Sequence, residues 1–121
     1  MKNSTFIILL VLCCALYSCF NTTKNKRIGD LIIKKIDMFF DNNGYLPGPV
    51  YFNGSVDEFL NYQFNSEDTT RIGVSVLDIG GDVFWYERID NESYMVGFGT
   101  TLGEGVYYYS DTKEWKDSRH P

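Results

Sequence analysis

Histidine and cysteine are scarce in this chain of 121 residues. The one histidine is His120, and the three cysteines all lie near the N-terminus, at Cys13, Cys14 and Cys19. Nucleophilic catalysis needs a base beside the nucleophile, and zinc sites need several histidine or cysteine ligands. The sequence after Cys19 therefore offers no cysteine–histidine pair, no zinc site and no disulfide framework. Glycine-rich phosphate- and dinucleotide-binding motifs are also absent, so we expect no metal and no cofactor.

A basic surface is missing as well. The chain carries 11 lysine and arginine residues against 16 aspartate and glutamate residues, which gives a formal net charge of −5. Proteins that bind nucleic acid present clustered basic side chains to the phosphate backbone. This charge balance therefore excludes nucleic acid as the expected partner. The exception is a short basic stretch near the N-terminus, made up of Lys24, Lys26, Arg27, Lys34 and Lys35.

The longest apolar run is too short to cross a membrane. It extends from Phe6 to Leu16, which is 11 residues, and polar residues follow it. A spanning helix needs about 20 apolar residues. The run does fit the apolar core of a secretory signal peptide, with Lys2 supplying the positive charge in front of it. We therefore expect residues 1–18 to be a signal peptide.

The end of this segment carries a more specific motif. Leu16-Tyr17-Ser18-Cys19 resembles the lipobox of bacterial lipoproteins, although Tyr17 departs from the strictest form. The resemblance implies that Cys19 is alkylated with diacylglycerol, that the leader is removed and that the new N-terminus is acylated. Two or three acyl chains anchor a protein stably where one is marginal. The alternatives are an ordinary leader, for example one cut after Ala15, and an uncleaved short anchor.

The lipobox also predicts where the protein is located. The residue after Cys19 is Phe20 and not an aspartate, so by similarity to lipoproteins nothing retains the protein at the inner membrane. We expect an outer-membrane lipoprotein that faces the periplasm, with a lipidated tether at 19–26. Residues 27–117 then form a single domain, and 118–121 a disordered tail.

Helical periodicity dominates the first part of this domain. Apolar residues from Ile28 to Phe40 recur at spacings of three and four, which predicts an amphipathic helix over 26–42. Gly44 suits the left-handed position after a helix, and Tyr45 is placed to fold back on the last turn. Ser55 and Glu58 have the spacing of a capping box, which predicts a short helix over 56–62 with Phe59 and Leu60 inward.

From residue 71 onward the hydrophobic period changes to two. Tyr94, Val96 and Phe98 alternate with Met95, Gly97 and Gly99, and short polar turns separate the runs. Short turns predict antiparallel pairing, since parallel strands need long crossovers. We expect an α+β fold with the long helix packed on an antiparallel meander of three or four strands. In this sheet, Tyr94, Val96 and Phe98 face the core.

The glycines of the fourth run suggest a binding surface. Gly97 and Gly99 leave one sheet face nearly bare, so that Trp85 or Tyr108 can lie across the backbone. The stretch Phe84–Arg88 and the tyrosines near 108 place large rings on both faces. If one face stays open, Trp85, Tyr86 and Tyr108 form a candidate surface for a sugar or an envelope protein. Alternatively, residues 45–65 cover these rings, or the rings only bridge the glycines.

Carboxylates are the only plausible catalytic reagents. A pair of them can act as acid and base on a glycosidic bond, or bind calcium. Ordinary solvation at turns and strand ends explains them equally well, and we expect no enzyme and no catalytic residue. The residues concerned are Asp78, Asp82, Glu87, Asp90, Glu92 and Glu104.

Two further resemblances concern fold and location. One helix followed by a loop and an antiparallel meander is similar to the soluble part of pilin-like proteins, although the prepilin leader motif is absent. The segment from Gly103 to Trp115, GEGVYYYSDTKEW, looks like the tail of small uncharacterised bacterial lipoproteins. The sequence therefore suggests a lipid-anchored, non-enzymatic interaction module of the cell envelope. The alternatives are a glycan-active enzyme and a pseudopilin-like component of a secretion system.

Overall fold

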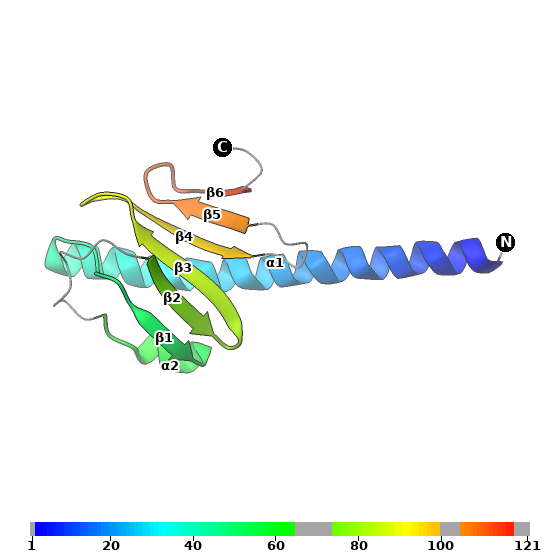
Figure 1. Cartoon of the computed structure of the whole chain (residues 1–121), viewed down its shortest axis with the longest axis horizontal. Helices are drawn as coiled ribbons and strands as arrows, with labels where there is room; N and C mark the ends of the chain where they lie inside the picture. Colours follow the sequence, from blue (N-terminus) through cyan, green and yellow to red (C-terminus); the bar gives the residue numbers. More distant parts are fainter. Residues whose placement is uncertain (1, 65–73, 100–104, 118–121) are drawn as a thin grey trace.

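The longest element of the fold is its N-terminal helix. The computed structural model describes residues 2–64, 74–99 and 105–117, with side chains from Thr23 onward. Helix α1 (Lys2–Asn43) contains the helix predicted at 26–42 and extends beyond the sheet at its N-terminal end (Figure 1). It also continues through 19–26, where we expected a tether. Its end is as predicted: Gly44 has φ 80°, and its amide donates a hydrogen bond of 2.8 Å to the carbonyl of Phe40.

The sheet is larger than predicted. Six strands pair in sequence order, so the expected antiparallel meander of three or four strands is wrong, although the fold is still α+β. The four neighbour pairs from β2 to β6 are antiparallel, whereas β1 pairs with β2 in parallel. The strands are β1 (Tyr51–Gly54), β2 (Val74–Ile79), β3 (Asp82–Arg88), β4 (Tyr94–Gly99), β5 (Gly105–Tyr109) and β6 (Glu114–Asp117).

The parallel edge strand has a clear physical origin. A parallel neighbour needs a crossover connection, and residues 55–73 supply one that contains helix α2 (Val56–Asn61). The prediction considered only hairpin connections after residue 71 and so excluded β1. Strand β6 was also missed, because its four residues, Glu-Trp-Lys-Asp, are mostly charged. Charged, short strands are typical of sheet edges, where they discourage pairing with other chains.

Helix α2 begins as the sequence predicts. The amide of Glu58 donates to the Ser55 hydroxyl at 3.1 Å, and the Glu58 carboxylate accepts from the amide of Ser55 at 3.3 Å. These two bonds complete the capping box. The inward face was only half right: Phe59 is 1% exposed, whereas Leu60 is 47% exposed. In six residues the helix turns less than twice, so neighbouring positions point in different directions.

The core lies between α1 and one face of the sheet. The predicted inward residues Tyr94, Val96 and Phe98 are all buried, which confirms that part of the register. Isoleucines spaced along α1 pack against them, as an amphipathic helix requires. Apart from those three residues of β4, the core consists of Ile28, Ile32, Ile33, Ile36, Leu46, Val50, Phe59, Leu77, Ile79, Phe84 and Tyr86.

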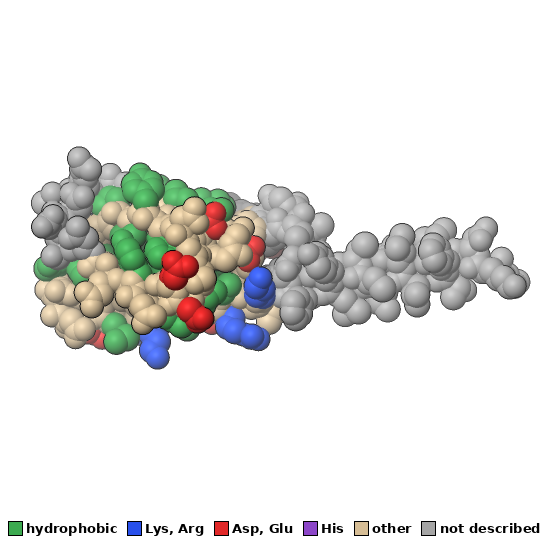
Figure 2. Space-filling model, turned by 90° about the horizontal axis from the view of Figure 1, so that it is seen from below, with side chains coloured by type: hydrophobic (Ala, Val, Ile, Leu, Met, Phe, Trp, Pro, Cys, Tyr) green, Lys and Arg blue, Asp and Glu red, His purple; other side chains and the backbone are tan. Residues whose placement is uncertain are grey.

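The last strand is tied to the helix through Trp115. Its indole Nε1 donates a hydrogen bond of 3.2 Å to the Asp30 carboxylate. The ring lies so close to Gly29 that a β-carbon there would be 2.6 Å from its Cη2 atom. At the end of the domain from which α1 emerges, charged side chains of both signs gather on the surface (Figure 2). One ion pair in this part of the molecule joins Lys24 to Asp82 at 3.4 Å.

Candidate functional site

The face of the sheet opposite α1 carries apolar side chains that the helix does not cover. Because side chains alternate along a strand, every second residue of each strand points to this open face. Four of them are well exposed: Tyr51 at 77%, Val74 at 45%, Val76 at 38% and Val83 at 42%. Isolated exposed apolar residues are ordinary, but a contiguous set is typical of a binding surface.

One row of paired residues crosses the open face from edge to edge. It contains one residue from each strand, and each of these residues is paired with the one on the neighbouring strand. Apart from Gly97, all of its members project a large side chain onto the same face. In order from β1 to β6 they are Tyr51, Val76, Trp85, Gly97, Tyr107 and Lys116.

Two rings of this row lie close to glycines of the sheet. A β-carbon at Gly97 would be 2.6 Å from Cδ1 of Tyr107 and 3.5 Å from Cε3 of Trp85. A β-carbon at Gly105 would be 2.6 Å from Cε2 of Tyr107, and one at Gly99 would be 3.9 Å from Cη2 of Trp85. The missing side chains of Gly97 and Gly105 thus leave room for the Tyr107 ring, the arrangement known as aromatic rescue, whereas Trp85 lies at ordinary contact distance beside it. We call Trp85 and Tyr107, together with the glycines beneath them, the aromatic platform.

The structure separates the three residues predicted as a binding surface. Trp85 lies on the open face as proposed, but Tyr86 and Tyr108 point to the opposite side, toward α1, so the prediction was wrong for both. Tyr86 is 2% exposed, and its hydroxyl donates a hydrogen bond of 2.8 Å to the carbonyl of Pro47. Burial raises the pKa of the Tyr86 hydroxyl, so this residue stays neutral and structural.

Tyr108 belongs to an aromatic cluster on the helix side. Its ring centroid is 6.2 Å from that of Tyr94 and 5.5 Å from that of Trp115. Desolvation, followed by the nearby Asp37 and Asp30 carboxylates, raises the pKa of its hydroxyl. The ring over the glycines is that of Tyr107, its neighbour in the sequence. Because residues 107–109 are all tyrosines, the sequence pattern alone does not show which ring faces which side.

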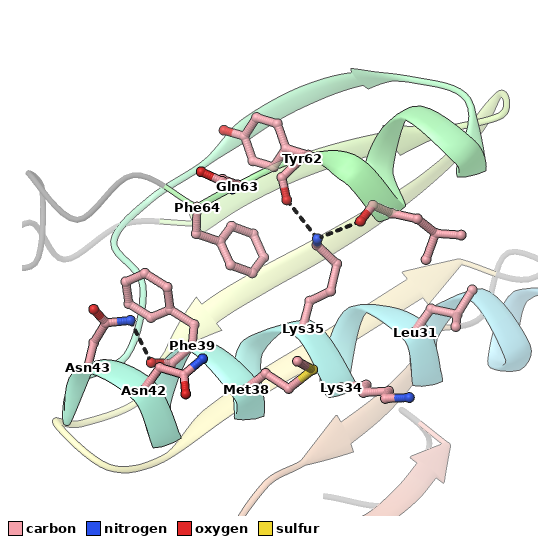
Figure 3. A pocket seen from close by; sticks show the side chains of 11 residues that line it. Leu31, Lys34, Lys35, Met38, Phe39, Asn42, Asn43, Tyr62, Gln63 and Phe64 are labelled. Carbon is pink, nitrogen blue, oxygen red and sulfur yellow. Dashed lines mark hydrogen bonds between the residues drawn. The ribbon is translucent and has the colours of Figure 1, made fainter.

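A groove of about 610 Å³ lies between α1 and the segment that follows α2 (Figure 3). Lys35 projects from α1 across it and donates hydrogen bonds to the carbonyls of Tyr62 at 2.6 Å and Leu60 at 3.3 Å. Its ammonium group also lies 5.4 Å from the centre of the Phe59 ring. Partial burial lowers the pKa of Lys35. Lys35 therefore links α1 to the C-terminal end of α2, and we assign it a structural role and not a ligand-binding one.

A second hollow, of about 660 Å³, is rich in carboxylates. Two of these already have partners. The Tyr94 hydroxyl donates to Asp37 at 2.7 Å, and the amides of Glu92 and Ser93 both donate to Asp90 at 2.8 Å. The hydrogen bonds from these amides hold the pKa of Asp90 below its usual range, so Asp90 is unsuited to act as a general acid. The other acidic residues of the hollow are Asp41, Glu92 and Asp111.

Within the described ranges, no three His, Cys, Asp or Glu side chains gather closely enough to hold a metal ion. The other predicted carboxylates are dispersed: Asp78 and Glu87 lie on the open face, and Asp82 pairs with Lys24. Glu104 and His120 lie outside the described residues. Cys19 lies within α1, but the structure does not describe its side chain or those of the other lipobox residues.

Among the described residues, no helix has an apolar stretch of the length that a membrane span requires. No protein-family model matches the chain, and neither the curated proteins nor the solved structures compared with it provide a match.

Proposed function

We propose that this protein is a lipid-anchored, non-enzymatic binding protein of the bacterial cell envelope. Acylation of Cys19 attaches it to the outer membrane, and the domain faces the periplasm. The open face of the sheet is its binding surface. The observation that supports this proposal best is the row of side chains from Tyr51 to Tyr107 on the face turned away from α1. Tyr51 and Val76 are exposed in this row, and Trp85 and Tyr107 are half-buried.

The exposed side chains support binding for an energetic reason. Burying apolar surface stabilises a complex by about 25 cal/mol per Å² removed from water. Val76 is the cross-strand neighbour of Trp85, and Val83 lies two residues before Trp85 on the same strand; each valine is more than one third exposed. They serve neither the core nor the contact with α1. A partner that covers them gains free energy without disturbing the fold.

The anchor is tested by Cys19→Ala. We expect the wild-type protein to carry diacylglycerol on Cys19, which intact-mass spectrometry detects, and to fractionate with the outer membrane. The variant should lose the lipid and either accumulate with its leader or leave the membrane. Cys14→Ala is the matched control, because it removes a cysteine of the leader and should change neither mass nor location of the mature protein. Outer-membrane association of a Cys19→Ala protein that has lost its leader would contradict the anchor.

The binding surface is tested by site-specific crosslinking in the acylated protein. A photoreactive residue in place of Val83 samples the open face, whereas one in place of Asp57 samples helix α2. We expect envelope components to be captured from position 83, and capture to be lost on Trp85→Ala. Equal capture from both positions, or capture from 83 that ignores Trp85→Ala, would contradict the proposed surface.

The acidic hollow supports a second candidate function, hydrolysis of glycans by paired carboxylates. Asp41, from α1, and Glu92, from the turn before β4, line the hollow together. Inverting and retaining glycosidases both need one protonated and one ionised carboxyl group. Release of reducing sugar from envelope glycans that disappears in both Asp41→Asn and Glu92→Gln would favour this alternative over binding.

A further inference from the structure

The aromatic platform has the geometry and charge of a sugar-binding site. We propose that Trp85 and Tyr107 stack on the pyranose rings of a neutral glycan in the cell envelope. This inference depends on the open face being the binding surface, and it adds the chemical class of the ligand. It follows from the orientation of the two rings, from the charge around them and from the size of the face.

The orientation of the rings comes first. A ring that lies along a sheet has one face against the backbone and turns the other face outward. The Tyr107 ring takes the space that β-carbons at Gly97 and Gly105 would fill, which places it in that position, and the Trp85 indole lies beside it at contact distance from the Gly97 position. Both residues are half-buried, as expected for rings covered on one side only. Flat ligands with an apolar face stack on such a surface without needing a pocket.

Sugars and nucleotide bases both have faces that stack on aromatic rings, and charge distinguishes between them. Single-stranded nucleic acid needs a positively charged groove along its backbone. Within the described strands, Lys116 is the one basic residue on the open face, opposite Tyr107. It is outnumbered by three acidic residues on the same face, which are Asp78, Glu87 and Glu114. This charge disfavours phosphates and uronates, and it leaves a neutral glycan.

The same charged residues suit the edge of a sugar. A pyranose ring has an apolar face formed by C–H groups and hydroxyls around its rim. Glu87 lies two residues beyond Trp85 on the same face, and Lys116 is the cross-strand neighbour of Tyr107. A carboxylate accepts hydrogen bonds from hydroxyls, and an ammonium group donates them. The platform therefore combines stacking surfaces at its centre with hydrogen-bonding groups at its margin.

The dimensions of the face suit a short glycan. With strands spaced about 4.8 Å apart and a rise of about 3.3 Å per residue, six strands of five residues span a plane of roughly 400 Å². A short run of sugar rings fits within this plane.

The test uses the acylated full-length protein in detergent and isothermal titration calorimetry. The neutral probes are cellohexaose, chitohexaose and maltohexaose, and a single-stranded DNA oligonucleotide is the anionic probe that also stacks. We expect at least one neutral probe to bind with a Kd of about 1 mM or tighter, and the oligonucleotide not to bind. Trp85→Ala and Tyr107→Ala should each weaken binding about tenfold or more, by comparison with the stacking of bases on aromatic side chains.

Two further variants separate the effect of ring position from the effect of losing a ring. Gly97→Ala removes no ring, but its new methyl group pushes Tyr107 off the backbone, and binding should weaken. Tyr45→Ala is the matched control, because Tyr45 is an exposed ring that follows α1 and lies outside the sheet; binding should stay within about twofold. Thermal unfolding of each variant verifies that the domain is folded.

Three results would overturn the inference. They are no binding of any neutral hexasaccharide up to about 1 mM, binding that is unchanged in Trp85→Ala and Tyr107→Ala, or preferential binding of the oligonucleotide. Failure of the broader proposal is recognised separately. If crosslinking from position 83 captures envelope components while no glycan binds, the glycan inference is wrong and the binding surface stands. If neither occurs, both are wrong.

Discussion

Replacing Gly29 by alanine should destabilise the protein, although helix propensity predicts the opposite. Gly29 lies in the interior of α1, where alanine is favoured over glycine by about 1 kcal/mol. The new β-carbon, however, would lie 2.6 Å from Cη2 and 2.8 Å from Cζ2 of Trp115. These atoms belong to a ring that is held in place by its hydrogen bond to Asp30 and by edge contact with Phe98, at 5.5 Å between centroids.

The size of the effect follows from the two opposing terms. Forcing an extra methyl group into a packed contact costs about 1–3 kcal/mol. After the gain in helix propensity, the expected net loss is about 1 kcal/mol of unfolding free energy. For a domain of this size, that corresponds to a decrease in Tm of roughly 4–8 °C. Thermal unfolding followed by circular dichroism, with urea titration at one temperature, measures both quantities.

A double-mutant cycle identifies the cause. In Trp115→Leu the side chain is too short to reach Gly29, so adding Gly29→Ala to this variant should stabilise it by about 1 kcal/mol. The coupling between the two positions is then about 2 kcal/mol. If Gly29→Ala stabilises the wild-type protein and the Trp115→Leu variant equally, the indole does not constrain the helix, and the reasoning is refuted.

Two further predictions concern single polar groups. Ser75 is fully buried, and its hydroxyl accepts a hydrogen bond of 2.6 Å from the amide of Val50. Ser75→Ala should therefore lower the unfolding free energy by about 1–3 kcal/mol, because it leaves that amide unpaired. Urea titration tests this, and a smaller loss of unfolding free energy than in the exposed control Ser55→Ala would contradict it. Asp90 has a lowered pKa, so its contribution to stability should be complete above the usual aspartate pKa of about 3.9 and should be lost as the pH falls through the lowered value. In Asp90→Asn this acid-dependent part of the unfolding free energy should be absent, and an unchanged pH profile would argue against the turn contacts of Asp90.

Local signals predicted the helices and one strand register well. The helix stop at Gly44 and the capping box of Ser55 and Glu58 depend on a few neighbouring residues, so the sequence contains the whole of each motif. The inward positions of β4 were also correct, because Val96 and Phe98 alternate with Gly97 and Gly99 there. Each of these features is determined within a few residues of chain.

Features that depend on distant residues were not predicted. The parallel pairing of β1 with β2 is set by a crossover between them, and the sequence of β1, Tyr-Phe-Asn-Gly, does not alternate between apolar and polar residues. The orientation of Tyr107 and Tyr108 depends on the register between β4 and β5, since three consecutive tyrosines carry no alternation. The same holds for the candidate surface: Trp85 lies on the open face, but the ring beside it over the glycines is that of Tyr107 and not Tyr108.

The contact between Trp115 and α1 has a consequence for the order in which the molecule assembles. Asp30 and Trp115 are 85 positions apart, so the partners of this contact come from nearly opposite ends of the domain. A chain that emerges N-terminus first, from a ribosome or from a membrane channel, exposes the Gly29 side of its helix long before the indole arrives to cover it. The domain therefore cannot complete its packing until almost all of the polypeptide has been released. A chain truncated before residue 115 should lack the contact between the indole and α1 altogether.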